Sequence, residues 1–288
     1  MMTKILICGA TSFVAKGFAD LLTQEGFDVD CFSRGLQAER EGNIIRGKYS
    51  EIDKNDCLAP QYDIVVNFAI LKDASVQDNI EYLQNLLQMC QEHGVKKLVH
   101  FSSVMAYNYH LPTVDESTQI DTLENTRMKG YGEIKIATDW FLQKKRADMP
   151  FEVILVRPGY VLADNRPCPF IKHLVGPFYV IKGNKKSKQP IVHREDIHFA
   201  LLKIIQQEDN LLVYHFFPTD GMTKYRFAKE NVKGFVLTMP KIIFNGIPYV
   251  MMKIGLMKPS LYSRFEGMYI ESDFQSLKTQ EKLNIKFR

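Results

Sequence analysis

The sequence predicts an α/β fold built on a doubly wound parallel sheet, with a smaller C-terminal lobe. Across residues 4–217, short apolar runs alternate with amphipathic stretches, an order that produces parallel strands joined by right-handed crossovers. The apolar runs lack polar alternation, which indicates that helices cover the sheet on both faces. The length of 288 residues suits one α/β unit with a single large core.

Each predicted element follows from its own pattern. Residues 4–8 (KILIC) form a buried strand, and residues 13–26 a helix that Gly26 ends, because Phe18, Leu21 and Leu22 have helical spacing. Apolar residues on one face predict a second helix over residues 79–94. The other predicted strands span residues 29–32, 43–45, 62–70, 95–103, 151–159 and 212–217, and the other helices residues 131–144 and 194–207.

The pattern loosens after Pro158. We expect residues 1–165, completed by about 189–217, to form the core, and residues 166–188 and 218–288 to form the smaller lobe. Within this lobe, residues 234–257 are largely apolar, but prolines and lysines interrupt them, so no membrane span is expected. A buried or lid-like pair of short helices and a helix lying on a membrane surface remain open.

Composition excludes several classes of protein. A net charge of +4 and a pI near 8.6 are too mild to indicate binding to nucleic acid. The five cysteines show no CxxC motif and no metal-like pairing with histidine, so we expect free thiols in a reducing compartment and no metal site. The first strand begins within a few residues of the start, which leaves no room for a signal peptide, and we expect a cytoplasmic location.

The stretch CGATSFVAKG joins the first strand to the first helix. A glycine-rich turn at this place lets backbone N–H groups and a helix N-terminus face a pyrophosphate. Gly9 is present, while Ser12 and Ala15 stand where two further glycines are usual. A strand–turn–helix that binds no ligand has the same pattern.

The second strand ends in FSRG. An acidic residue at this place would hold the ribose 2′-hydroxyl of NAD, but Ser33 and Arg34 stand there. A hydroxyl and a guanidinium suit a 2′-phosphate better, so the sequence favours NADP over NAD. An ordinary surface arginine is the alternative.

The stretch YGEIK places Tyr131 and Lys135 one helical turn apart. A free phenol has a pKa of about 10. A cation about 4 Å away, at an effective dielectric of about 20, contributes about 4 kcal/mol, which would lower that pKa toward about 7. Ser103 ends a strand in LVHFSS and is expected to reach the same substrate oxygen, whereas Ser102 fits a cap. A half-exposed helix face is the alternative for the pair.

Six stretches in order resemble the extended short-chain dehydrogenase/reductase family of NAD(P)-dependent sugar epimerases, dehydratases and reductases. The resemblance implies a Rossmann fold with a smaller C-terminal substrate-binding lobe. The stretches are GATSFVA, YDIVVNFAI with Asn79 starting the next helix, GVKKLVHFSSVMAY, YGEIKIATDW, VRPGYVLA, and PIVHREDIHFA with Asp196 in an acidic place; RFEGMYIESD adds a fainter match.

The resemblance also implies roles for residues. Tyr131 would be the acid–base, Lys135 would bind the nicotinamide ribose and lower the pKa of Tyr131, and Ser103 would bond to the reacting oxygen. Substrate would contact Ser103, His193 and Arg264. The cofactor would contact Gly9, Thr11, Ser12, Phe13, Val14, Ser33, Arg34, Phe68, Ala69, Lys135 and Pro158.

Two departures from the family bear on its chemistry. An acidic residue near the adenine is replaced by Lys48 or Tyr49. Val104 and Met105 stand where dehydratases carry an Asp–Glu pair, so elimination of water is disfavoured.

The expected substrate is a nucleotide-activated sugar, which undergoes 4-keto reduction or 4-epimerisation for polysaccharide biosynthesis. KGNKKSK, residues 182–188, offers four lysines to a diphosphate, although a solvated loop has the same composition. Reduction of an apolar alcohol or ketone, and a non-catalytic cofactor sensor or structural subunit, remain alternatives. The resemblance also implies a possible homodimer, because the helices before and containing Tyr131 often form a four-helix dimer contact in related proteins.

Overall fold

The computed structural model describes residues 2–108, 110–124, 126, 130–163, 168, 170–258, 261–262, 265 and 267–288. A large sheet runs through its centre, and every neighbouring pair of strands is parallel except the last. The predicted doubly wound parallel sheet is confirmed. The strand order is β13 (Val213–Phe216), β8 (Glu152–Pro158), β6 (Lys97–Phe101), β5 (Ile64–Asn67), β1 (Lys4–Cys8), β2 (Asp28–Arg34), β4 (Ile44–Gly47) and β3 (Glu39–Glu41).

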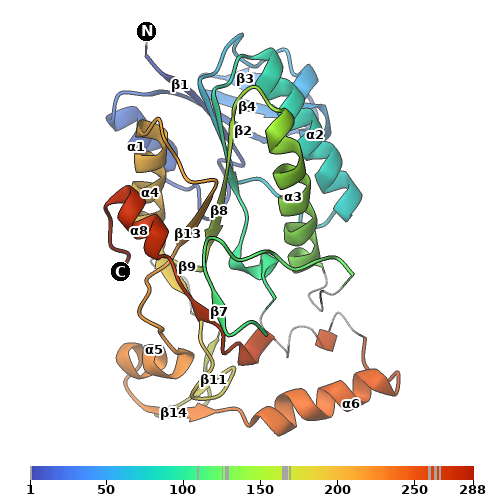
Figure 1. The fold of residues 1–288 in the computed structure, drawn as a ribbon, viewed down its shortest axis with the longest axis vertical. Coiled ribbons are helices and arrows are strands. Elements are labelled where there is room, and N and C mark those ends of the chain that lie inside the picture. Colours follow the sequence, from blue (N-terminus) through green and yellow to red (C-terminus); the bar gives the residue numbers. More distant parts are fainter. Residues whose placement is uncertain are drawn as a thin grey trace.

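Helices cover both faces of this sheet (Figure 1). Helices α1 (Phe18–Gln24), α4 (Arg194–Gln206) and α8 (Leu277–Leu283) lie on one face, and α2 (Val76–Glu92) and α3 (Tyr131–Lys145) on the other. Successive residues of β1 therefore pack into different cores: Ile5 and Ile7 into one, Leu6 and Cys8 into the other. Burial on both faces explains why the strand runs show no polar alternation.

The chain reverses its direction of winding between β1 and β5. Strands β2 and β4 follow β1 to one side, and β5, β6, β8 and β13 extend to the other. Gly9 follows β1 and Phe68 follows β5, so both lie at the carboxyl edge of this switch point. In open α/β sheets, ligands bind in the crevice at such a point.

The first helix begins later than its apolar spacing predicts. Residues 12–16 form one turn, in which the Lys16 N–H donates to the Ser12 carbonyl at 3.2 Å. Gly17 then adopts a left-handed conformation, with φ 86°, and α1 starts at Phe18. The prediction of one helix over residues 13–26 was wrong because this glycine breaks the helix.

Two other boundaries differ from the predictions. Helix α2 begins at Val76 because Ser75 and Asp78 form a capping box, so Asn79 lies inside the helix and does not start it. The predicted strand 62–70 is shorter, since β5 ends at Asn67 and the chain turns toward the switch point.

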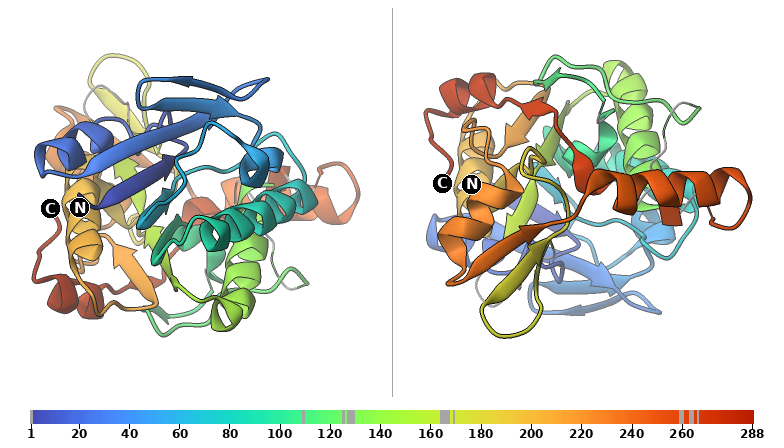
Figure 2. Two further views of the ribbon diagram at one scale, coloured as in Figure 1. Left: turned by 90° about the horizontal axis from the view of Figure 1, so that it is seen from above. Right: turned by 90° about the horizontal axis from the view of Figure 1, so that it is seen from below.

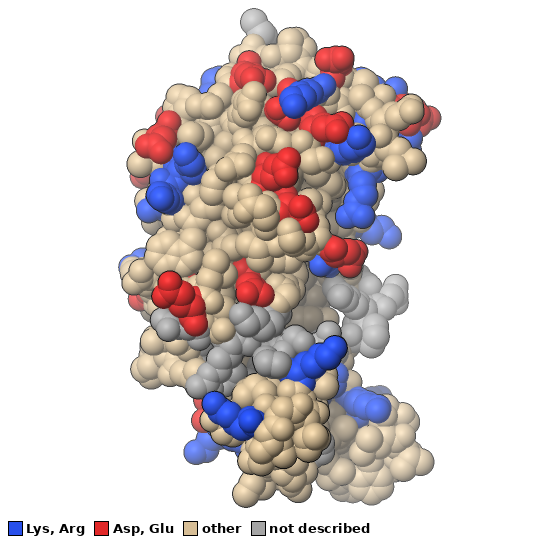
Figure 3. Space-filling view, turned by 90° about the vertical axis from the view of Figure 1, so that its right-hand side faces the viewer, with Lys and Arg blue, Asp and Glu red and all other residues tan. Residues whose placement is uncertain are grey.

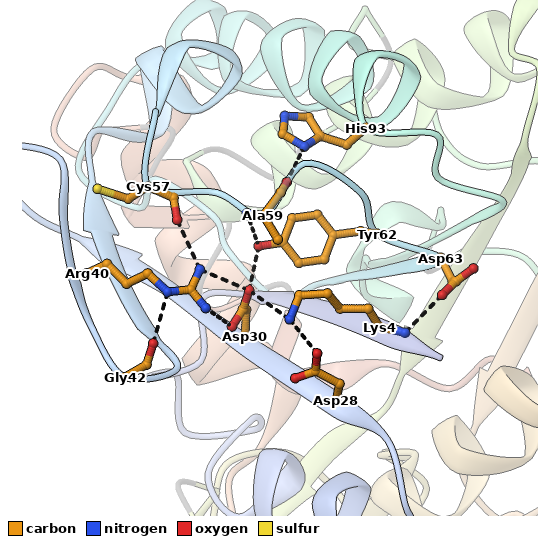
Figure 4. A network of polar contacts seen from close by, with 10 residues as sticks. All are labelled: Lys4, Asp28, Asp30, Arg40, Gly42, Cys57, Ala59, Tyr62, Asp63 and His93. Atoms are coloured by element: carbon orange, nitrogen blue, oxygen red, sulfur yellow. Dashed lines mark hydrogen bonds and ion pairs between the residues drawn. The ribbon is translucent and has the colours of Figure 1, made fainter. Parts of the chain in front are cut away.

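Strand β3 was not predicted, because its residues are all charged. It pairs antiparallel with β4, and its Arg40 reaches the buried Asp30 of β2, with 2.7 Å between Nη2 and Oδ1. Figure 4 shows this network, in which the Tyr62 hydroxyl also donates to Asp30 at 2.7 Å. A buried carboxylate therefore holds this edge strand in place of apolar packing.

The smaller lobe lies below the carboxyl edge of the sheet in Figure 1. It contains the sheet β10 (Ile171–His173), β11 (Phe178–Ile181) and β14 (Phe235–Thr238), then α5 (Lys224–Asn231), the π-helical turn η4 (Ile242–Gly246) and α6 (Ile247–Lys253). Two short parallel pairs adjoin it: β9 (Tyr160–Leu162) with β12 (Ile191–His193), and β7 (Thr113–Val114) with β15 (Asp273–Phe274).

The apolar segment 234–257 forms β14, η4 and α6, so short helices are present as predicted. Most of its large side chains are exposed, so these helices are not buried, and the lid-like and membrane-surface alternatives stay open. Among the described residues, no helix is long and apolar enough to span a membrane.

A buried ion pair joins α3 to the sheet. The Arg157 Nε of β8 lies 2.8 Å from the Asp139 Oδ2 of α3, and both side chains are almost fully excluded from solvent. Arg157 Nη1 also donates to the Tyr107 hydroxyl at 2.6 Å, and that oxygen lies 2.6 Å from the His215 Nε2 of β13.

Breaking this pair should destabilise the protein strongly. Asp139→Asn leaves the Arg157 charge buried without its counter-ion, and we expect the free energy of unfolding to fall by about 3–5 kcal/mol. Chemical denaturation measures it. Glu230→Gln, which breaks the exposed Arg226–Glu230 pair, is the matched control and should have little effect. Equal effects of the two substitutions would contradict the role assigned to Asp139.

Candidate active site

A cavity of about 1060 Å³ opens at the carboxyl ends of β1, β5, β6 and β8, between the sheet and the smaller lobe. This volume lies at the upper end of the range of about 300–1,000 Å³ that is usual for ligand sites. The cavity brings together most of the residues that the sequence singled out: Gly9, Thr11, Ser12, Phe13, Val14, Arg34, Phe68, Ala69, Ser103, Tyr131, Lys135 and Pro158.

Of the predicted residues that the structure describes, two do not line the cavity. Ser33 is buried within β2, and His193 is the residue before the first turn of α4. Arg264 lies outside the described residues. Asp196, also singled out, pairs with Arg288 at the surface.

Gly9 lets the turn after β1 pack directly against the backbone of Ala69, just beyond the end of β5. Its φ is +77°, and a Cβ at this position would lie 2.7 Å from the Ala69 nitrogen. Both observations require glycine. Because α1 starts only at Phe18, the dipole nearest the cavity belongs to the single turn of residues 12–16 rather than to a full helix.

Arg34 and Tyr49 line the cavity beyond the end of β2. Lys48 does not line it; its ammonium pairs with Glu51 at 3.0 Å. Lys48 and Tyr49 stand where the family carries an acidic residue near the adenine, and of these two only Tyr49 lines the cavity. Its ring packs against Phe32 and Tyr82, which fixes its orientation.

Tyr131 and Lys135 occupy the first turns of α3 and face the same space. The Lys135 Nζ lies 5.7 Å from the centre of the Tyr131 ring and donates to the Phe101 carbonyl at 2.5 Å. Burial lowers the pKa of Lys135 to about 8. Tyr131 is 38% exposed, yet the surrounding walls desolvate its hydroxyl and raise its pKa to about 12.

In the protein chain by itself the pKa of Tyr131 is therefore raised and not brought toward about 7 as expected. Desolvation dominates at the phenol, and the ammonium is directed at the Phe101 carbonyl. The Tyr131 phenol is therefore protonated at neutral pH, and the neighbouring Lys135 ammonium is close to losing its proton.

Of the two serines after β6, Ser102 was expected to cap a helix, but the structure gives this role to Ser103. Ser103 is the cap of the short helix η2 (Val104–Ala106), and its oxygen accepts from the Met105 N–H at 3.2 Å. Its own O–H remains able to donate. The Ser102 Oγ is buried and has no hydrogen-bond partner among the described residues. Both serines line the cavity.

Charge is distributed unevenly around the cavity. Within the part of the chain that the structure describes, no aspartate or glutamate lines it, whereas five cations do: Arg34, Lys72, Lys135, Lys182 and Lys224. Lys224 is buried and donates to the carbonyls of Lys182 and Met268, at 3.2 and 2.9 Å, and burial lowers its pKa to about 8. Unneutralised buried cations favour an anionic ligand.

Sequence reasoning missed Lys224 and Lys72. Lys224 follows the helix cap Thr223, where a lysine is ordinary, and only the tertiary fold brings it to the cavity. These residues, together with the close approach at Gly9 and the unpartnered Ser102 hydroxyl, fit a dinucleotide with a second anionic ligand beside it.

Comparison with solved structures supports the fold. MoeE5 in complex with UDP-glucuronic acid and NAD has a TM-score of 0.70 and 18% identity, covering 99% of this chain and 94% of that chain. UDP-N-acetylglucosamine 4-epimerase from Bacillus cereus has a TM-score of 0.67 and 17% identity, and the match covers 99% of this chain and 93% of that chain. Human epimerase family protein SDR39U1 with NADPH has a TM-score of 0.67 and 15% identity, and the match covers 99% of this chain and 95% of that chain.

No curated protein matches the sequence. The model of the NAD dependent epimerase/dehydratase family matches residues 5–217, which include the switch point, both serines, Tyr131 and Lys135. The chain therefore belongs to the NAD dependent epimerase/dehydratase family and is an enzyme of the extended short-chain dehydrogenase/reductase type.

Proposed function

We propose that this enzyme moves a hydride between NADP(H) and a nucleotide-activated sugar, in a 4-keto reduction or a 4-epimerisation. The observation that carries the proposal is the cavity itself, where Tyr131, Lys135 and Ser103 share one space with four further cations and no described acid. A dinucleotide and a sugar nucleotide are both polyanions, so both suit such walls.

The cofactor, when bound, supplies or accepts the hydride. Tyr131 gives its proton to the reacting oxygen in reduction and takes it back in oxidation. Ser103 donates its O–H to the same oxygen and holds it near the phenol. Lys135 binds ribose hydroxyls, and its charge stabilises the phenolate that forms when Tyr131 releases its proton.

Arg34 supports NADP as the preferred cofactor. It lines the cavity at the end of β2, and no described acidic residue there would repel a 2′-phosphate. A guanidinium can bind a phosphate through two hydrogen bonds. A neighbour bound to NADPH and one bound to NAD share this fold.

We propose that residues 166–188 and 218–288 form the substrate lobe, with Lys182 and Lys224 next to the diphosphate. His193 and Arg264 remain proposed substrate contacts. MoeE5 with UDP-glucuronic acid and the UDP-N-acetylglucosamine 4-epimerase support the sugar nucleotide. Val104 and Met105 line the cavity without an acid, which disfavours elimination of water.

An apolar alcohol or ketone is the second candidate substrate. Phe170, Ile270 and Phe274 line the lobe side of the cavity and would suit one. The buried Lys224 favours the sugar nucleotide, because an apolar ligand would leave its charge unneutralised. We further propose a cytoplasmic enzyme of polysaccharide biosynthesis, consistent with five free cysteines, and a homodimer formed through α2 and α3.

Tyr131→Phe removes the proposed proton donor. We expect turnover of a 4-keto sugar nucleotide by NADPH to fall about 100-fold or more, with the dissociation constant of NADPH unchanged. Tyr249→Phe, at a tyrosine of similar exposure on α6, is the control. Full turnover in Tyr131→Phe would end the mechanism. Cofactor binding without turnover in the wild type, across a panel of such sugars and apolar ketones, would support a sensor.

Arg34→Ala removes the proposed 2′-phosphate ligand. We expect the dissociation constant of NADPH to rise about 10- to 100-fold, while that of NADH stays the same, because only NADPH carries the lost phosphate contact. Fluorescence titration measures both constants. Arg46→Ala on β4, whose partner is Glu39, is the control. An unchanged preference for NADPH would remove Arg34 from the site.

The pH dependence of reduction should follow Lys135. Its ammonium is charged below a pKa of about 8 and loses its charge as the pH rises through that value, whereas Tyr131, with a pKa of about 12, stays protonated. We therefore expect kcat/KM to be flat below about pH 7 and to fall about tenfold per unit above about pH 9. Melting temperatures over the same range control for unfolding. A rate that rises with pH would contradict this assignment.

A further inference from the structure

The helical segment 242–253, together with its C-cap Ile254, carries an apolar stripe that faces solvent. Ile243, Ile247, Val250 and Ile254 follow one another at spacings of four, three and four residues, which places them on one side of a helix. Their exposed fractions lie between 49% and 63%. In a globular protein such a stripe normally faces the core, so its exposure requires another partner.

The arrangement of the lobe leaves this stripe uncovered. Helix α6 projects from the end of the molecule that lies farthest from the N-terminus in Figure 1. Seen from below, in the right panel of Figure 2, no described element lies over it. The sheet of β10, β11 and β14 lies at the same end and exposes Phe178, Phe235 and Leu237.

The part of the sequence that contains the stripe carries only positive charges. Between Glu230 and Glu266 the sequence contains no aspartate or glutamate. The exposed basic residues that the structure describes there are Lys233, Lys241, Lys253 and Lys258. Figure 3 shows acidic and basic side chains mixed over the upper body, while the lower lobe is mostly uncharged and its charged side chains are mainly lysine and arginine.

From this geometry we propose that α6 docks the enzyme on an anionic membrane surface. The aliphatic stripe enters the boundary between headgroups and acyl chains, and the lysines beside it contact lipid phosphates. Lys253 lies to one side of the stripe, with its Nζ 5.6 Å from the centre of the Tyr249 ring. A long cationic side chain and a tyrosine at this border are typical of helices that lie in an interface.

A second copy of the chain fits this surface less well. In a two-fold dimer the same patch faces itself, so a patch that contains Lys241, Lys253 and Lys258 would meet an equally basic patch, with no acid between Glu230 and Glu266 to pair with these lysines. An anionic bilayer supplies both the apolar layer and the missing negative charge. The proposal concerns a surface away from the cavity and stands whether or not the proposed reaction is correct.

Vesicle co-sedimentation of the full chain tests the proposal. The wild type should bind vesicles that contain phosphatidylglycerol, bind vesicles of phosphatidylcholine alone far less, and lose affinity as salt is added. Ile247→Asp should weaken binding at least tenfold, since it places a carboxylate in the buried stripe. Leu277→Asp, an equally exposed apolar position on α8, should bind as the wild type does.

A second pair of variants measures how much the lysine charges contribute to vesicle binding. Lys241→Gln/Lys253→Gln should weaken binding about tenfold and reduce its salt dependence, while the exposed pair Lys144→Gln/Lys145→Gln should not. Circular dichroism and melting temperatures verify folding. Absence of wild-type binding, or an equal loss in Ile247→Asp and Leu277→Asp, would overturn the proposal. So would a wild-type dimer that ignores vesicles and that Ile247→Asp dissociates.

Discussion

The ion pair between Arg157 and Asp139 fixes the geometry on which the site depends. Asp139 lies one helical turn after Lys135 on α3, and Arg157 directly precedes Pro158 at the cavity wall. Tyr107 adds a third element to the same junction through its hydroxyl. Two buried charges are stable only when they are paired and hydrogen-bonded, so a rotation or slide of α3 would separate Asp139 from Arg157 and leave both charges buried. Because Tyr131 and Lys135 lie on the same helix as Asp139, the ion pair also determines where these two side chains lie.

The cavity differs from the Arg157–Asp139 pair, because no aspartate or glutamate among the described residues lines the cavity beside its buried lysines. Lys135 and Lys224 donate to backbone carbonyls, and burial lowers the pKa of both to about 8. The folded chain thus carries a desolvation cost that polyanionic ligands offset when they bind. Binding should consequently stabilise the fold, because such ligands recognise the folded form alone. The Arg157 junction positions α3 and with it Lys135, whereas the carbonyls of Lys182 and Met268 in the lobe hold Lys224.

Sequence reasoning succeeded where the signal is local. Apolar runs located the sheet strands, and the motifs around Gly9, Ser103 and Tyr131 identified the residues that now share one cavity. It failed where tertiary structure decides. Gly17 breaks a helix whose spacing looked continuous, and the charged β3 depends on a distant Asp30. Lys224 reaches the cavity only through the lobe, and the pKa of Tyr131 reflects desolvation that no spacing reveals.

The segment 234–257 shows the same limit most clearly. An apolar period of 3.6 residues predicts a helix with one apolar side but does not say what covers that side, because burial in a core and burial in a membrane have the same pattern. Here the lobe leaves the stripe open at the end of the molecule, with the cavity between it and the main sheet. A molecule docked through α6 would therefore hold its Rossmann core away from the bilayer, with the reaction cavity on the side of the core nearer the lipid.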